Sequence, residues 1–147
     1  MMPSRPTTLN ICSFNARSLR HKLAETAHFV DCHAINVLTV LESWLGPTIP
    51  DNLLYMPGFQ APYRKDRNTR TQGGGVCIFV STNLPCRRCA ELEYSELEMI
   101  WIEVFLKKCP ILIGCCYRPP NTCDNFYDLL ENSLENATKK RHTCGRL

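Results

Sequence analysis

The sequence predicts an α/β fold, and three neighbouring segments support this class. Leu9–Phe14 and Ile35–Leu41 are short apolar runs with the spacing and β-branched content of buried strands. Between them, Lys22–Cys32 repeats apolar side chains at helical spacing. A strand, a helix and a strand in this order form a βαβ unit, in which the two strands are parallel and the crossover is right-handed. We therefore expect a sheet that contains at least one parallel pair.

The middle of the chain predicts a long loop followed by a hairpin. Gly46–Gly58 contains three prolines and is expected to be irregular, and Phe59–Arg64 is a candidate short strand. Gly73-Gly74-Gly75 then leads into the apolar strand Val76–Val80. The glycines are compatible with a hairpin turn or with a backbone platform near a phosphate, since they permit positive φ and close approach. They match neither a P-loop nor a dinucleotide-binding pattern.

The C-terminal third predicts two strands and a helix. Leu97–Phe105 alternates between two faces, and Ile111–Tyr117 follows after a hairpin link. Asn125–Ala137 has the apolar spacing of an amphipathic helix. We expect residues 1–8 to be a lead, residues 9–137 to form the domain, and residues 138–147, which are basic and lack apolar periodicity, to be a tail. One face of the first of these strands is expected to carry Glu98, Ile100, Ile102 and Val104.

Bulk properties fit one ordinary globular domain. The chain has 147 residues, of which 44% are apolar and 21% are charged. The net charge of +3 is too small to indicate nucleic-acid binding by itself. The first residues lack the apolar core of a signal peptide, and no run of about 18 apolar residues exists. We expect an intracellular protein, nuclear or cytoplasmic, that does not enter a membrane.

The ten cysteines are expected to be reduced thiols because the chain carries no secretory signal. Cys86 and Cys89 form a single C-x-x-C pair, and a zinc site would need a second pair. His142 and Cys144 are the distant candidates, but their spacing is poor. A zinc site is therefore not favoured.

Polar side chains follow three of the predicted strands. Asn15 ends the first, Glu42 ends the second, and Tyr117, Arg118 and Asn121 end the strand near the C-terminus. In open α/β sheets, ligand sites gather beyond the strand ends. These groups therefore predict one shared site, although each on its own is compatible with a residue that only caps a strand.

Five segments carry motifs in a characteristic order: Ser13–Leu19, Leu41–Leu45, Gly73–Phe79, Leu97–Glu103 and Cys116–Asn121. Taken together, they resemble the endonuclease/exonuclease/phosphatase family. Among its branches, they are most similar to the apurinic-type endonuclease domain of non-LTR (LINE-like) retrotransposons. The match runs from about Leu9 to Leu134. The resemblance implies a four-layer α/β sandwich, in which two mixed β-sheets lie face to face with helices outside.

The resemblance also implies Mg²⁺-dependent cleavage of a DNA phosphodiester. Asn15 and Glu42 would hold the metal, for which oxygen ligands are suitable. Tyr117 would lie near the scissile phosphate and share the catalytic role with them. Arg118 and Asn121 would contact DNA or orient the site. The basic segment before the glycines would also bind nucleic acid, although a solvated loop is the simpler interpretation of any single basic cluster; its basic residues are Arg64, Lys65, Arg67 and Arg70.

The resemblance also has a limit. The family continues with a strand ending in Gly-Asp-Phe-Asn, followed by an Asp and a Ser-Asp-His segment that supply the base and orient the attacking water. None of these is found in this sequence. We therefore expect the second sheet to be largely missing, the metal site to be incomplete, and the chain to be inactive alone. An uncovered apolar sheet face would favour self-association.

Several alternatives remain open at this point. The chain is compatible with a nuclease completed by another polypeptide, and with a non-enzymatic remnant that binds DNA or protein through its basic loops. Within the same family, a phosphatase of small phosphorylated lipids or inositols is the second enzyme class. The simplest alternative is an inert fragment in which Asn15 and Glu42 only cap strands.

Overall fold

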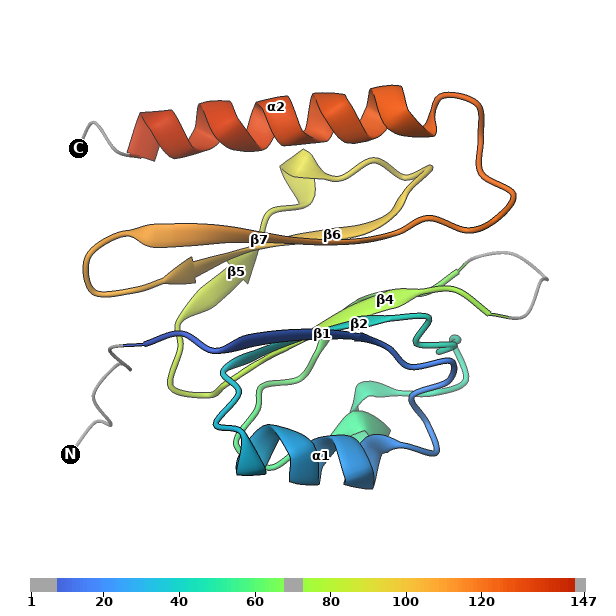
Figure 1. Cartoon of the computed structure of the whole chain (residues 1–147), viewed down its shortest axis with the longest axis vertical. Coiled ribbons are helices and arrows are strands. Elements are labelled where there is room, and N and C mark those ends of the chain that lie inside the picture. Colours follow the sequence, from blue (N-terminus) through green and yellow to red (C-terminus); the bar gives the residue numbers. More distant parts are fainter. Residues whose placement is uncertain (1–7, 68–72, 145–147) are drawn as a thin grey trace.

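The computed structural model describes residues 8–67 and 73–144, which form two β-sheets stacked between two helices (Figure 1). The first sheet has the strand order β1-β2-β4-β3, and the second has the order β5-β6-β7. The predicted four-layer α/β sandwich is confirmed. None of the helices in the described residues is long and apolar enough to cross a bilayer. The elements are β1 (Ile11–Asn15), α1 (Leu23–Cys32), β2 (Val37–Leu41), β3 (Tyr63–Lys65), β4 (Val76–Val80), β5 (Cys86–Arg88), β6 (Glu98–Phe105), β7 (Pro110–Tyr117) and α2 (Phe126–Cys144), with 3₁₀ turns η1 (Asp51–Leu54) and η2 (Ala90–Leu92).

The βαβ unit predicted at the N-terminus is present. β1 and β2 are parallel, with Ile11 opposite Val37 and Asn15 opposite Leu41. α1 crosses between them and covers the outer face of the first sheet, where Val30 packs with Leu38 and Phe79. β4 then joins β2 in antiparallel orientation, and β3 joins β4.

The second sheet contains one strand that the sequence did not predict. β6 and β7 form the expected hairpin, and β5 pairs with the other side of β6. β5 has only three residues, two of them arginine, so it lacks the apolar alternation of a strand. Ion pairing to β6 stabilises it, since Arg87 lies 2.8 Å from the carboxylate of Glu103. The strand predicted at Phe59–Arg64 forms later, as β3, and Phe59 makes an isolated bridge to Ser81.

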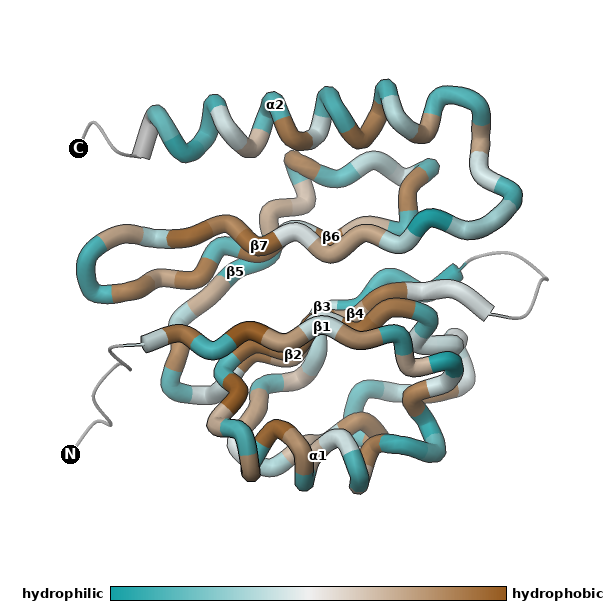
Figure 2. Tube along the Cα trace, in the orientation of Figure 1, coloured by the Kyte–Doolittle hydropathy of each residue, from teal (hydrophilic) through white to brown (hydrophobic). Residues whose placement is uncertain are grey.

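The two faces of β6 pack against different layers, as the alternation predicted. Ile100, Ile102 and Val104 are buried between the two sheets, together with residues of β2 and β4. Met99 and Trp101 point the other way and pack under α2. The hydropathy of the trace shows apolar segments concentrated on the facing strands (Figure 2).

The second sheet is more complete than the sequence indicated. It has three strands, which cover β2, β3 and β4 of the first sheet, because β6 lies over β3 and β4 while β7 lies over β4 and β2. The expectation that this sheet would be largely missing is therefore too strong for the described residues. What remains uncovered is the inner face of β1, where Ile11 is 48% exposed.

Residues 138–144, predicted as part of a basic tail, are helical. α2 continues from Ala137 to Cys144 without a break. The apolar stripe stops at Ala137, but lysine and arginine are good helix formers, and basic residues in the last turn favour the helix dipole. Lys140 also ties this part of the helix to Glu91 across 2.8 Å.

The buried hydroxyl of Ser133 fixes α2 to the second sheet. It accepts a hydrogen bond from Trp101 Nε1 at 2.8 Å and donates one to the carbonyl of Leu92 at 2.6 Å. We expect Ser133→Ala to lower the free energy of unfolding by about 1–3 kcal/mol, because it leaves two buried polar groups unpaired. Urea unfolding measures this loss. Ser95→Ala, at an exposed serine, is the control and is expected to change little; equal effects of the two would contradict the prediction.

Candidate functional site

Glu42 stands directly after β2 on a backbone that non-glycine residues rarely adopt. Its φ is +51°, and Trp44 two residues later has a φ of +54°. A non-glycine residue in this backbone conformation costs on the order of 1–3 kcal/mol of stability, so the conformation persists only where the surrounding structure imposes it. Here the loop is tied on both sides: Ser18 N–H donates to the carbonyl of Glu42 at 3.0 Å, and Ser43 N–H donates to the carbonyl of Gly75 at 3.1 Å.

Three strand ends from both sheets meet at the Glu42 carboxylate. Asn15 Nδ2 donates to Glu42 Oε1 at 2.9 Å, and the Tyr117 hydroxyl donates to the same oxygen at 2.7 Å. Asn15 ends β1 and Tyr117 ends β7. The structure thus brings together three of the five residues for which the sequence indicated a common site. We call Asn15, Glu42 and Tyr117 the carboxylate cluster.

These hydrogen bonds fix the protonation states of the cluster. Donation by Asn15, followed by donation from Tyr117, holds the pKa of Glu42 below its ordinary value of 4.5. The same bond to Glu42 raises the pKa of Tyr117 above its ordinary value of 10.0. At neutral pH the cluster therefore consists of a carboxylate anion that accepts hydrogen bonds from an amide and a phenol.

An ion pair that the sequence did not predict lies beside the cluster. Arg67 Nε donates to Glu98 Oε1 at 2.7 Å, and its second nitrogen donates to Glu98 Oε2 at 3.1 Å. The bonds to Glu98, aided by the nearby negative charge of Glu42, raise the pKa of Arg67. The available signal was Glu98 itself, a charged residue on the apolar face of β6.

The glycine run makes room for this arginine. Gly74 has a φ of +67°, and a side chain there would collide with the guanidinium of Arg67. Gly75 has a φ of +81°, donates its N–H to Glu98 at 3.2 Å, and would meet the buried hydroxyl of Ser43 if it carried a Cβ. The glycines are therefore required for packing at the site, while a role as a phosphate platform stays a prediction.

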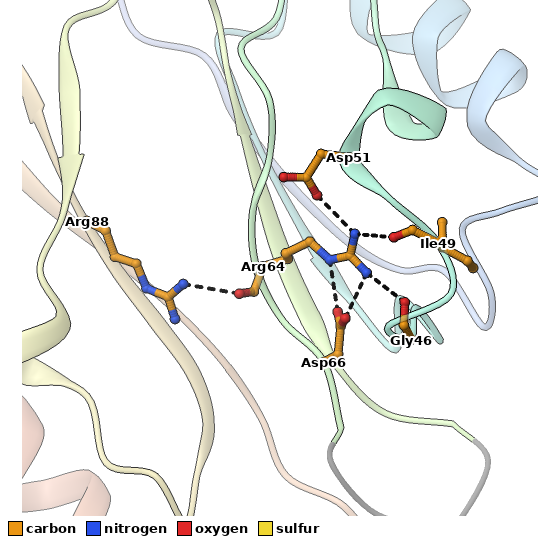
Figure 3. Close-up of polar contacts among 6 residues, drawn as sticks. All are labelled: Gly46, Ile49, Asp51, Arg64, Asp66 and Arg88. Carbon is orange, nitrogen blue, oxygen red and sulfur yellow. Dashed lines mark hydrogen bonds and ion pairs between the residues drawn. The ribbon is translucent and has the colours of Figure 1, made fainter.

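The other basic residues of this segment serve different purposes. The guanidinium of Arg64 is engaged inside the protein, by Asp51, Asp66 and two backbone carbonyls (Figure 3). Lys65 donates to the carbonyl of Tyr94 at 2.8 Å, and burial lowers its pKa. Arg70 lies outside the described residues. The guanidinium of Arg64 is thus engaged within the protein, and the contacts of Arg64, Lys65 and Arg70 to nucleic acid stay predictions.

The segment after β7 leads away from the cluster. The guanidinium of Arg118 lies over the rings of Tyr127 and Phe126, at 5.2 and 5.9 Å from their centres. Asn121 is exposed in the loop before α2. Both residues stay available to a ligand at the surface, and their predicted contacts to DNA stay predictions.

The carboxylate cluster fits a sparsely ligated Mg²⁺ site. Glu42 offers an ionised carboxylate, and among the described residues the Asn15 amide oxygen accepts a hydrogen bond only from the N–H of Arg17, at 3.2 Å. Mg²⁺ is commonly held by one or two such groups while it keeps several waters. Within residues 8–67 and 73–144, no three His, Cys, Asp or Glu side chains are grouped closely enough to enclose a metal. His28, in α1, contacts Cys32, and His33, which directly follows α1, contacts the carbonyl of Phe29.

The chain was compared with protein families, curated proteins and solved structures. No family model matches the chain, and no curated protein matches it. Among solved structures, it is similar to the endonuclease domain of TRAS1, a telomere-specific non-LTR retrotransposon, with a TM-score of 0.64 and 13% identity. The likeness covers 89% of this chain and 54% of that one, so this chain spans about half the length of the solved domain. At this identity the likeness shows the fold alone, and it confirms an endonuclease-like α/β fold.

The Glu42–Tyr117 hydrogen bond generates a titration prediction. Tyr117→Phe removes a donor that favours the carboxylate, so the pKa of Glu42 is expected to rise towards 4.5. Because the pKa is lowered in the folded protein, Glu42 contributes stability above about pH 4.5 and loses it as the pH falls through the folded pKa. Carboxyl NMR titration measures the shift. Tyr55→Phe, at an exposed tyrosine, is the control, and an unchanged pKa in Tyr117→Phe would refute the hydrogen bond.

The contact between Gly74 and Arg67 generates a second prediction. Gly74→Ala forces a side chain into the guanidinium at a positive φ, so it should destabilise the fold by about 1 kcal/mol or more. Gly58→Ala is the matched control, because Gly58 also has a positive φ, of +82°, while a Cβ there meets open space. Thermal unfolding of both variants makes the comparison; a loss no larger for Gly74→Ala than for Gly58→Ala would contradict this role of the glycine.

Proposed function

We propose that this chain is part of a Mg²⁺-dependent DNA endonuclease domain of retrotransposon type. The observation that carries the proposal is the carboxylate cluster: an ionised Glu42, bonded by Asn15 and Tyr117, at the meeting point of three strand ends. The cluster lies in a fold shared with a retrotransposon endonuclease domain. The sequence resemblance assigned the same three residues to the metal and the scissile phosphate.

The residues of the cluster have different roles in binding the metal and the phosphate. Glu42 and the amide oxygen of Asn15 would hold Mg²⁺, which when bound polarises a phosphate and stabilises charge on the leaving oxygen. The Tyr117 hydroxyl fixes the orientation of the carboxylate and stands where a phosphate oxygen would approach. Arg67 lies beside the cluster, but its guanidinium is paired with Glu98, so the pair adds no net charge for a phosphodiester and the predicted contact of Arg67 to nucleic acid stays a prediction.

The described residues offer no group suited to activate water at the cluster. Tyr117 holds its proton more firmly than a free phenol because it donates to Glu42. Efficient general-base catalysis needs a group whose pKa lies near the working pH. We therefore propose that the chain alone binds the metal and phosphodiester weakly and does not turn over.

Two measurements on the same variants test this function. Mn²⁺, used as a paramagnetic substitute for Mg²⁺, should broaden the side-chain amide signals of Asn15 in the wild type and not in Glu42→Gln. Supercoiled plasmid with Mg²⁺ should remain uncut by either protein. Glu25→Gln, at an exposed carboxylate on α1, is the control and should bind Mn²⁺ like the wild type.

Each result has a distinct meaning. Broadening in the wild type and in Glu42→Gln alike would remove Glu42 from the metal site. Nicking by the wild type that disappears in Glu42→Gln would show a complete catalytic set and overturn the proposed inactivity, while it would support the assignment of Glu42.

A further inference from the structure

The two tryptophans of the chain have different surroundings. Trp101 is 7% exposed, packs under α2 and donates its indole N–H to Ser133. Trp44 is 37% exposed, and it belongs to none of the buried apolar clusters of the described residues. A tryptophan side chain has a large apolar surface and is highly buried in most proteins. Core packing therefore does not explain the tryptophan at position 44.

The backbone at Trp44 is tied on both sides. The N–H groups of Ser43 and Trp44 donate to carbonyls of the glycine run, at 3.1 and 2.9 Å. The carbonyls of Glu42 and Ser43 accept bonds of 3.0 Å from the N–H groups of residues 18 and 19. These bonds hold Trp44 at its positive φ of +54°. The Cβ of Trp44 is therefore fixed in place, in a conformation that glycine would adopt with less strain.

The indole of Trp44 lies against the glycine run and reaches Glu42. A methyl group on Gly73 would stand 3.4 Å from Trp44 Nε1 and 3.7 Å from its Cε2, which is van der Waals contact. After the other members of the carboxylate cluster, Asn15 first, the Trp44 side chain lowers the pKa of Glu42 by hydrogen bonding. The indole therefore borders both the glycine run and the carboxylate cluster, with part of its surface left exposed.

Arg17 is a second exposed group close to Glu42. After the hydrogen bonds to Glu42, of which that of Asn15 has the largest effect, the charge of Arg17 also lowers the pKa of Glu42. Among the described residues Arg17 forms no ion pair, whereas Arg67 is held by Glu98. A free arginine is suited to a phosphate oxygen. The carboxylate cluster thus has a cation and an exposed aromatic ring beside it, which is the combination that binds single-stranded nucleic acid.

The neighbours of Trp44 favour a nucleobase as the group that covers it. A protein partner would also cover an exposed indole, but the cores of protein interfaces are depleted of charged residues, and Trp44 stands beside the charges of Glu42 and Arg17. A nucleotide carries a flat ring next to a phosphate, so one ligand meets both kinds of group. The face of a base is accessible only when the base has left the duplex stack.

We propose that Trp44 is a platform on which an unpaired nucleobase stacks when the neighbouring phosphodiester lies at the carboxylate cluster. This inference rests on the proposed function, and it adds the form of the substrate: a single strand, or a duplex that is opened locally. It also accounts for an exposed tryptophan on a strained backbone, a combination that core packing does not explain.

Fluorescence of the full chain tests the stacking directly, because only one of the two tryptophans is exposed. The probe is a short oligothymidylate with Mg²⁺, and its matched control is the same phosphate backbone without bases. Saturating oligothymidylate should quench the tryptophan emission of the wild type, and the base-free backbone should not. The quenched part should be missing in Trp44→Leu, in which only the buried Trp101 still emits.

Two substitutions of Trp44 separate stacking from a general effect on folding. Trp44→Leu removes the flat face, so its affinity for oligothymidylate should fall at least about fivefold, while its affinity for the base-free backbone stays unchanged. Trp44→Phe keeps an aromatic face and should lose less. Fluorescence anisotropy of end-labelled oligonucleotides measures these affinities without using the tryptophans.

Phe29→Leu is the matched control for an exposed aromatic residue. Phe29 is 43% exposed on α1 and stacks on His33, which directly follows that helix and precedes β2. Asn15 and Glu42 lie at the opposite ends of β1 and β2, because the two strands are parallel. Phe29→Leu should therefore bind both oligonucleotides like the wild type.

Three results would overturn the platform. One is equal quenching by the oligothymidylate and by the base-free backbone. Another is a loss of affinity in Trp44→Leu that is the same for both oligonucleotides, or that Phe29→Leu reproduces. The third is no binding of oligothymidylate by the wild type.

The proposed function has a separate readout, the broadening of the Asn15 signals by Mn²⁺ without DNA. Broadening together with unchanged affinities in Trp44→Leu would remove the platform and leave the metal site. Base-dependent quenching without broadening would support the platform and remove the metal from Glu42 and Asn15.

Discussion

The packing of the two sheets against each other is the constraint on which the rest of the structure depends. Val37, Ile78 and Ile102 are fully buried where the sheets meet, and each such side chain contributes roughly 1.5–3 kcal/mol by leaving water. This layer sets how β7 lies relative to β1 and β2. The hydrogen bond from Tyr117 to Glu42 spans 75 positions of sequence and exists only because that packing holds the strand ends together.

Much of the fold could be predicted because its strands and helices follow simple periodicities. The β1–α1–β2 unit and the two faces of β6 follow from apolar spacing alone. β5 could not be predicted because two of its three residues are arginines, which do not give the apolar pattern of a strand. The ion pair between Arg87 and Glu103 stabilises it in the folded protein. The end of α2 was missed because Lys140 and its neighbours continue the helix through propensity and ion pairs, after the apolar stripe has ended.

The candidate site was partly predictable for a related reason. Asn15, Glu42 and Tyr117 each follow a recognisable strand, so their convergence could be expected from topology. The pairing of Arg67 with Glu98 could not, because it joins a loop to a strand in the other sheet across 31 positions of sequence. The internal role of Arg64 was hidden for the same reason: its acceptors, from Gly46 to Asp66, are assembled only by the folded chain.

The positive φ at Glu42 affects which substitutions would accumulate at this position. Glycine, or asparagine to a lesser degree, adopts a φ near +51° with less strain than glutamate does. If the side chain had no task, replacement by glycine would relax the turn, and neutral change would tend to accumulate in that direction at positions 42 and 44. A glutamate and a tryptophan occupy them instead. Among variants of this chain, the residue found at position 42 therefore reports whether the site is still under selection.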